Sequence, residues 1–276
     1  NIKKNKDKYF ILKVYKKNQK YLLIKNTKFN FLKNLSIFPM EELSNPKNFI
    51  ENLNFKMSNM NMNIKIQYLK DISKYGVGLN NIDMDSMIKY KIKLGWKGGV
   101  NKRSVSEMTL GFMLILTRNL YMTSNLLKNG VWKKDGGVQL SGKTIGIIGI
   151  GNIGKDLILL LKPFRCNILV NDIVNQKDFY KDNSLKEVSK EDIFKNADII
   201  TVHTPLDSST KNIINKKSLS MMKSSSIIIN TARVGIVNQQ DLKWALRNRI
   251  IAGAAIDVYE VEPPDDKELL LIPNLI

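Results

Sequence analysis

The stretch TIGIIGIGNIG, residues 144–154, decides the fold expected for this chain. An apolar run over residues 144–148 is followed at once by the spacing G-x-G-x-x-G at Gly149, Gly151 and Gly154. The run predicts a strand covered on both faces, and the residues after it predict a helix. The first glycine permits a tight turn, the second a close approach of pyrophosphate, and the third close helix–strand packing. The start of the predicted helix would then hold the phosphates of a dinucleotide.

An acidic residue follows this turn where recognition of an adenosine ribose needs one. Asp172 lies 18 positions after Gly154 and ends the next predicted strand. A carboxylate there can bind both ribose hydroxyls of NAD and would repel the 2′-phosphate of NADP. No arginine follows Asp172 closely, so the sequence favours NAD. The alternative is a glycine turn with a purely structural role.

Strands and helices alternate through the C-terminal half of the chain. The strands are short, apolar and rich in β-branched residues, and helical segments separate them. After the strand predicted over residues 144–148, we expect further strands over residues 167–172, 197–203, 225–230 and 251–259. This alternation predicts an α/β fold with a doubly wound, Rossmann-like parallel sheet.

The segments before the glycine turn are less regular. We expect one long helix over residues 104–130, because Ser104 and Glu107 fit a capping box and Gly130 fits a C-cap. Gly111 inside this helix predicts a close packing contact. Further toward the N-terminus, the sequence indicates strands within residues 9–15 and 20–25 and a loop over residues 57–63.

Charge and composition narrow the classes of partner. The net charge is +19, and residues 1–140 hold 26 basic and 9 acidic side chains. The cations are nearly all lysine, without an arginine cluster or repeated aromatic spacing, so we expect solvated lysines and no nucleic-acid partner. The single cysteine, Cys166, excludes an internal disulfide and a cysteine-based zinc site, and we expect it to be a small core residue and no metal to bind. No apolar run reaches the roughly 18 residues of a membrane span, so no membrane partner is expected.

From Tyr68 onward the sequence resembles the D-2-hydroxyacid dehydrogenase family. The resemblance rests on KYGVGLNNID, NKRSVSEMTLGFML, LSGKTIGIIGIGNIG, DIITVHTPLDSSTKNIIN, INTARVGIVN and AGAAIDVYEVEPP. It implies an NAD-binding domain over residues 97–276. Residues 1–96 would be part of a smaller α/β substrate-binding domain, although residues 1–60 match the family poorly. It also implies NAD as the cofactor, a small 2-hydroxy or 2-keto acid as the substrate, and assembly into a homodimer or homotetramer.

The resemblance further implies roles for individual residues. Arg233 would bind the substrate carboxylate and carbonyl oxygen, and Glu262 would pair with a catalytic histidine and keep it protonated. The other implied substrate contacts are Gly76, Val77, Gly78 and Asn101. The implied cofactor contacts are Val77, Gly149, Gly151, Asn152, Ile153, Gly154, Asp172, His203, Thr204, Thr231 and Asp257. An arginine suits the substrate because its planar guanidinium can bind a carboxylate through two hydrogen bonds.

His203 is the only histidine in the chain, and histidine is the usual proton carrier near neutral pH. It ends a predicted strand of the cofactor domain, so we expect it in the wall of the dinucleotide groove. The resemblance instead places the catalytic histidine in a Pro-His motif directly after Ile276, and we therefore expect a chain cut before that residue. The resemblance favours the hypothesis of a cytoplasmic enzyme that oxidises 3-phosphoglycerate. The alternatives are a reductase of glyoxylate or hydroxypyruvate and an NAD-sensing protein of the same fold.

Overall fold

The computed structural model describes residues 71–74, 77–79 and 82–276, together with the backbone of short strands between residues 9 and 43. The chain divides into two compact units, residues 1–69 and residues 70–276. The domain boundary expected between residues 96 and 97 stays a prediction. In the first unit, antiparallel pairs join β1 (Tyr9–Leu12) to β6 (Met40–Leu43), β2 (Lys16–Lys17) to β3 (Lys20–Tyr21), and β4 (Ile24–Lys25) to β5 (Ser36–Ile37). The expected loop over residues 57–63 lies outside the described residues.

The second unit begins with two short strands on either side of a helix. β7 (Asp71–Ser73) pairs in parallel with β8 (Lys93–Gly95), and α2 (Met84–Lys89) lies between them in the sequence. The carboxylate of Asp83 caps α2 by accepting the Ser86 N–H at 3.0 Å, and hydrogen bonds from Ser86 lower the pKa of Asp83. These elements form a small strand–helix–strand unit before the main sheet.

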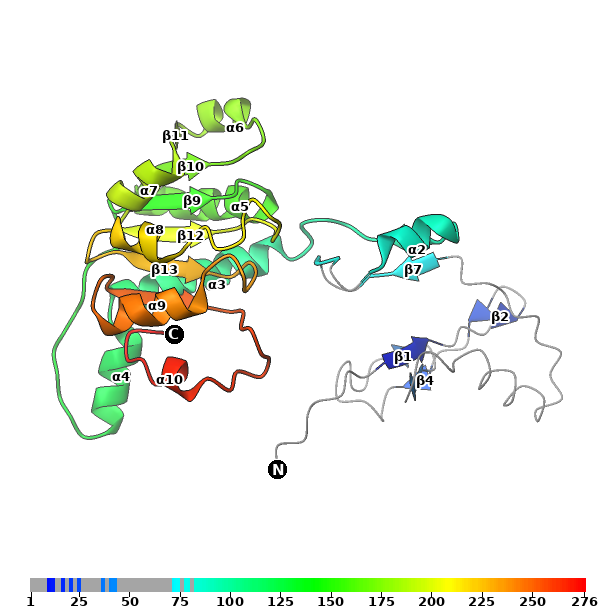
Figure 1. Cartoon of the computed structure of the whole chain (residues 1–276), viewed down its shortest axis with the longest axis horizontal. Helices are drawn as coiled ribbons and strands as arrows, with labels where there is room; N and C mark the ends of the chain where they lie inside the picture. Colours follow the sequence, from blue (N-terminus) through cyan, green and yellow to red (C-terminus); the bar gives the residue numbers. More distant parts are fainter. Residues whose placement is uncertain are drawn as a thin grey trace. The chain divides into compact units, whose positions relative to one another are not determined.

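The main sheet is parallel and has the order β11-β10-β9-β12-β13-β14, and Figure 1 shows β11 to β13 side by side in this order. Its strands are β9 (Thr144–Ile148), β10 (Asn167–Asn171), β11 (Lys186–Glu187), β12 (Ile199–Val202), β13 (Ile227–Asn230) and β14 (Gly253–Ile256). The chain leaves β9 toward β10 and β11, and then returns to β12 on the other side of β9. The predicted doubly wound sheet is confirmed, with its switch point at the carboxyl ends of β9 and β12.

Helices cover both faces of this sheet. The helices after β8 are α3 (Lys102–Thr117), α4 (Leu120–Lys128), α5 (Asn152–Leu161), the short 3₁₀ helix η2 (Lys162–Phe164), α6 (Lys177–Asp182), α7 (Lys190–Asn196), α8 (Lys216–Ser220), α9 (Gln239–Arg247) and α10 (Lys267–Leu270). Of these, α4 buries none of its residues. Ile147 packs on the face covered by α3, α5 and α6, whereas its neighbour Ile148 packs on the face covered by α7, α8 and α9. β9, β12, β13 and β14 are buried on both faces, which explains their nearly continuous apolar runs, whereas the edge strand β11 is exposed.

The long helix expected over residues 104–130 is in fact two helices. α3 ends at Thr117, and Asn119 adopts a left-handed φ of 53° before α4 begins. The returning loop stabilises this break, because the N–H of Val138 donates to the carbonyl oxygen of Thr117 at 2.7 Å. The Asn119 side chain also donates to Asp135 at 3.0 Å. The local pattern could not indicate the break, because its partners lie further along the chain.

These two helices correct two expectations and confirm a third. α3 begins after Asn101, so the capping box expected at Ser104 is wrong. The close contact expected at Gly111 is also wrong, since no atom lies within 4 Å of a Cβ built there. The C-cap expected at Gly130 is confirmed. Its φ is +76°, and the next N–H, that of Val131, donates back to Leu126 at 2.9 Å.

The described residues contain neither a metal-binding cluster nor a helix that can cross a membrane. No three of their His, Cys, Asp or Glu side chains are grouped so that they could hold a metal ion. None of the described helices is long and apolar enough to span a bilayer. Cys166 is half-buried just before β10, where its Sγ lies 3.4 Å from the carbonyl oxygen of Leu140. Burial raises the pKa of its thiol, so Cys166 is protonated at neutral pH and suits packing rather than nucleophilic attack.

Candidate functional site

The three glycines of the G-x-G-x-x-G spacing after β9 differ in what surrounds them. Gly149 has a φ of +96°, and a Cβ there would lie 2.7 Å from the carbonyl carbon of His203. A Cβ on Gly154 would overlap the carbonyl oxygen of Gly149, so this glycine lets α5 pack against the turn. Gly151 faces open space, with no atom within 4 Å of a Cβ. The protein's own packing therefore does not require the second glycine, which fits an approach by ligand phosphates.

The first turn of α5 can receive an anion. Gly151 occupies the N-cap and offers no side-chain cap, and no acidic residue lies in the first turn. The first N–H groups of a helix have no partner within the helix, and the helix dipole favours negative charge at this end. Asn152, which is exposed, and Ile153, which is half-buried, are the first two helical residues. The residues present therefore fit the pyrophosphate of a dinucleotide.

Asp172 lies directly beside this turn. It follows β10, and its Oδ2 accepts the N–H of Ile150 at 2.5 Å while its Oδ1 accepts the N–H of Val174 at 2.8 Å. The carboxylate thus fixes the backbone of the glycine turn. Each carboxylate oxygen can accept more than one hydrogen bond, so ribose hydroxyls can still bind. Ile173, which is 82% exposed, adds apolar surface next to the carboxylate.

The polar side chains at the end of β12 are buried. The Nε2 atom of His203 lies 3.0 Å from the hydroxyl of Thr201, and burial lowers the pKa of His203 to about 4. The imidazole is therefore neutral at pH 7, which disfavours a role as a protonated general acid. The Nδ1 atom of His203 and the hydroxyl of Thr204 are buried without a hydrogen-bond partner. Two such atoms beside the glycine turn fit a wall that a bound ligand completes.

The loop after β13 holds Thr231 and Arg233, and Asn230 fixes its shape. The Asn230 side chain accepts the N–H of Ala232 at 3.1 Å and donates to the carbonyl oxygen of Arg233 at 2.9 Å. The Arg233 guanidinium donates to the carbonyl oxygen of Ala232 at 2.7 Å. Among the described residues no carboxylate pairs with it, so most of its donors can bind an anionic substrate. Asn230 was not among the predicted site residues, although an asparagine that ends an apolar strand is visible in the sequence.

Two carboxylates follow β14 at the same edge of the sheet. The N–H of Asp257 donates to the carbonyl oxygen of Asn230 at 3.0 Å, so the ends of β13 and β14 are joined. Partial burial, and then the negative charge of Glu262, raise the pKa of Asp257. Glu262 is exposed, and its Oε1 accepts the N–H of Tyr259 at 3.4 Å. The two acidic residues therefore lie close enough to interact electrostatically.

The predicted substrate contacts before β9 are only partly described. Gly76 lies outside the described residues, and Gly78 is half-buried in the same loop. The carbonyl oxygen of Val77 accepts the indole N–H of Trp96 at 3.1 Å. Asn101 directly precedes α3 and makes no side-chain cap. The carboxyl edge of the main sheet thus unites the residues that follow β9, β10, β12, β13 and β14, whereas the roles of these loop residues stay predictions.

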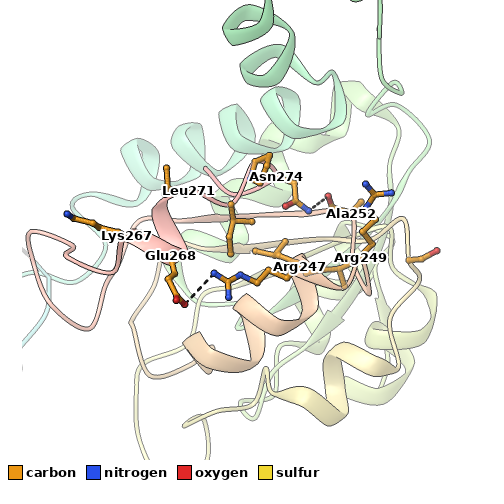
Figure 2. Close-up of a pocket in the computed structure, with 12 residues that line it drawn as sticks. Arg247, Arg249, Ala252, Lys267, Glu268, Leu271 and Asn274 are labelled. Atoms are coloured by element: carbon orange, nitrogen blue, oxygen red, sulfur yellow. Dashed lines mark hydrogen bonds and ion pairs between the residues drawn. The ribbon is translucent and has the colours of Figure 1, made fainter.

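A cleft of about 800 Å³ lies at the opposite edge of the sheet (Figure 2). Ala252 lines it directly before β14 and accepts a hydrogen bond from the Asn274 side chain at 2.8 Å. Arg247 and Glu268 form an ion pair at 3.3 Å in the wall of the cleft. Because the strands are parallel, their amino ends lie at one edge of the sheet and their carboxyl ends at the other. The cleft is therefore separate from the glycine turn.

Known proteins share this arrangement. Residues 110–276 match the NAD-binding domain of the D-isomer specific 2-hydroxyacid dehydrogenases. D-3-phosphoglycerate dehydrogenase of Methanocaldococcus jannaschii is 37% identical over 215 residues, which cover 77% of this chain and 41% of that protein. Hydroxypyruvate reductase of Thermotoga maritima is 36% identical over 213 residues, which cover 75% of this chain and 69% of that protein.

The structural comparison agrees with the sequence comparison. D-lactate dehydrogenase of Lactobacillus jensenii, solved with NAD+, has a TM-score of 0.68 and 30% sequence identity, covering 75% of this chain and 67% of its own. The chain thus spans about two fifths of the archaeal phosphoglycerate dehydrogenase and about two thirds of the other two proteins. The glycine turn, Asp172 and the parallel sheet lie within the region that matches the NAD-binding domain. The chain belongs to the D-isomer specific 2-hydroxyacid dehydrogenase family.

Proposed function

We propose that the protein to which this chain belongs is an NAD-dependent oxidoreductase that acts on a D-2-hydroxy acid. The observation that carries the proposal is the convergence, at one sheet edge, of the glycine turn, Asp172 and Arg233. The turn and Asp172 supply a phosphate site and a ribose site, and Arg233 supplies a cation for the substrate carboxylate. Ligands bind at this edge in open parallel sheets.

The proposed reaction moves a hydride and a proton from the substrate. NAD bound at the glycine turn would supply the hydride acceptor, so that loss of a hydride from the second carbon would convert the hydroxy acid into a 2-keto acid. The hydroxyl proton passes to a base, which the family resemblance implies is a histidine held by Glu262. Arg233 holds the carboxylate and the oxygen that becomes the carbonyl, and Asp257 holds the nicotinamide carboxamide.

As the substrate we propose 3-phosphoglycerate, which would place the protein in serine biosynthesis. The proteins named D-3-phosphoglycerate dehydrogenase in Methanocaldococcus jannaschii and Bacillus subtilis support this choice, at 37% and 35% identity. The phosphate of such a substrate needs further cations, and Lys74, after β7, is one candidate. Reduction of hydroxypyruvate or glyoxylate is the second proposal, supported by the relatives of those names in Thermotoga maritima and Thermofilum pendens.

Turnover by the protein expressed from its complete coding sequence tests both proposals. We expect NADH to form, measured by absorbance, when 3-phosphoglycerate and NAD are added together. If that mixture is inert while glyoxylate or hydroxypyruvate consumes NADH, the reductase proposal replaces it. If NAD binds but none of these acids is turned over, the enzyme proposal fails and an NAD-sensing protein remains.

A further inference from the structure

The turn at Gly98 and Gly99 lies directly against the first residue of α5. Gly99 has a φ of +74°, and a Cβ there would lie 2.6 Å from Cγ, 2.8 Å from Nδ2 and 2.9 Å from Cβ of Asn152. Because the Cβ of Asn152 is itself this close, a change of the Asn152 rotamer cannot make enough room. The turn and the helix therefore fit together only because position 99 has no side chain.

The residues after this turn hold it against α5. Ser106 of α3 is fully buried, and its hydroxyl donates to the carbonyl oxygen of Ile153 at 3.2 Å. Arg103 forms an ion pair with Asp156 at 3.0 Å, and the Asp156 side chain is only 5% exposed. Removing the partner of a buried charge is costly, so α3 cannot easily slide along α5. The Gly99 turn consequently stays against Asn152.

The turn also lies beside Trp96. The tip of the Trp96 ring lies 3.2 Å from the position of a Cβ on Gly98, and its indole N–H donates to Val77 at 3.1 Å. Gly98 and Gly99 thus connect the loop that contains Val77 with Asn152. The first of these is a predicted substrate loop, and the second is a predicted pyrophosphate contact.

We propose that Gly99 is a positioning residue for the dinucleotide site. Its turn holds the Asn152 end of α5 where the phosphates bind, and it links occupancy of that site to the surroundings of Trp96. Such a link acts in both directions, so dinucleotide binding also changes the environment of Trp96. The inference rests on the proposed binding of NAD at the glycine turn.

Gly99→Ala and Gly130→Ala, measured side by side in the 276-residue chain, test the inference. Both glycines have left-handed φ values, +74° and +76°, but no atom lies within 4 Å of a Cβ on Gly130. Both substitutions therefore strain the backbone, and only Gly99→Ala adds the overlap with Asn152. By calorimetric titration we expect NAD to bind roughly tenfold more weakly to Gly99→Ala, as overpacking predicts, and unchanged to Gly130→Ala.

A second substitution separates the overlap from other effects. Asn152→Gly removes the three atoms nearest to the new Cβ, so in this background Gly99→Ala should weaken NAD binding much less than in the wild-type chain. If the loss is equal in both backgrounds, Gly99 does not act through Asn152 and the inference is wrong. It is also wrong if Gly130→Ala weakens binding as much as Gly99→Ala does, because strain alone would then explain the loss.

The change in Trp96 fluorescence on ligand binding reports the proposed link directly, because a lower stability of the folded chain does not by itself alter this change. Replacing Trp132 and Trp244 with phenylalanine leaves Trp96 as the only tryptophan of the chain. We expect ADP-ribose, which lacks the nicotinamide, to change the Trp96 emission, and Gly99→Ala to reduce this change at saturating ligand. An unchanged emission on binding would overturn the link to Trp96. Failure of the unsubstituted chain to bind NAD or ADP-ribose at all would instead contradict the proposed function.

Discussion

His203 is buried in a place where a charged imidazole is unfavourable. Its pKa is lowered to about 4, whereas histidine in an unfolded chain titrates near 6.5. Between these values the unfolded state binds a proton that the folded state does not. The free energy of unfolding should therefore fall as the pH drops from 6.5 to 4, by about 3 kcal/mol from this residue. Urea unfolding at pH 7, 5.5 and 4.5 measures the decline.

His203→Asn provides the comparison, because asparagine does not titrate. The variant should be less stable at pH 7 but should lose less stability on acidification than the wild-type chain. Parallel declines in the two proteins would mean that His203 is not held neutral by burial. We also expect His203→Asn to weaken NAD binding modestly. A loss of turnover by several orders of magnitude with intact NAD binding would assign the proton transfer to His203 after all.

The glycines at positions 151 and 154 should respond differently to alanine. Gly151→Ala places its Cβ in open space, so we expect an unchanged melting temperature but weaker NAD binding, because the methyl group blocks the pyrophosphate. Gly154→Ala overlaps the backbone of Gly149, so both stability and NAD binding should fall. Thermal melting and calorimetric titration of the two variants check this. Equal stability losses would show that Gly151 is a packing residue.

Arg233 should contribute to binding of the hydroxy acid and not to binding of NAD. Arg233→Gln removes the charge that would hold the substrate carboxylate, so we expect kcat/KM for the hydroxy acid to fall roughly 10- to 100-fold, as for loss of charged hydrogen bonds. The Kd for NAD should be unchanged. Arg249→Gln is a matched control, because Arg249 lies in the cleft at the opposite edge of the sheet. Similar losses in the two variants would contradict the proposed role of Arg233.

At the scale of the elements, a buried hydroxyl pair sets how α3 lies on the sheet. The Thr109 hydroxyl lies 2.8 Å from the carbonyl oxygen of Val105 and 3.2 Å from the hydroxyl of Thr231. Thr109→Val keeps the shape but leaves the buried Thr231 hydroxyl without this partner. We expect a loss of about 1–3 kcal/mol in the free energy of unfolding, measured in urea.

Thr117→Val is the control for this change. The Thr117 hydroxyl bonds only to carbonyl oxygens of its own helix, the nearer being that of Met113 at 2.7 Å, so its removal leaves no distant group unpaired. We expect it to reduce stability less than Thr109→Val does, because a hydroxyl bonded back to its own helix contributes little to helix stability. If the two valine variants are equally destabilised, the contact between α3 and the end of β13 contributes little.

For the whole molecule, the homo-oligomer implied by the family resemblance stays a prediction, and we expect its interface at the exposed apolar side chains around α4. None of the residues of α4 is buried, and Leu127 and Trp132 are 55% and 78% exposed. Exposed apolar patches of this kind are typical of interaction surfaces. We expect sedimentation velocity to give a dimer or tetramer of the 31.6 kDa chain, and Leu127→Asp with Trp132→Asp to shift it to the monomer.

Leu271→Asp controls for the added charge. Leu271 is 79% exposed, but it directly follows α10 and lines the cleft at the opposite edge of the sheet. It should leave the sedimentation of the chain unchanged. A wild-type chain that sediments as a monomer at every concentration would contradict the expected homo-oligomer. Dissociation by Leu271→Asp alone would place the interface elsewhere.

The sequence by itself determined the parallel sheet, the glycine turn and the position of Asp172. These features depend on patterns between near neighbours: runs of apolar residues, the spacing of glycines, and the distance from a turn to the next strand end. The tertiary structure decided the break between α3 and α4, the neutral state of His203, the role of Asn230 and the fit of Gly99 against Asn152. Each of these depends on burial or on partners outside its own element, which only the packed chain brings together.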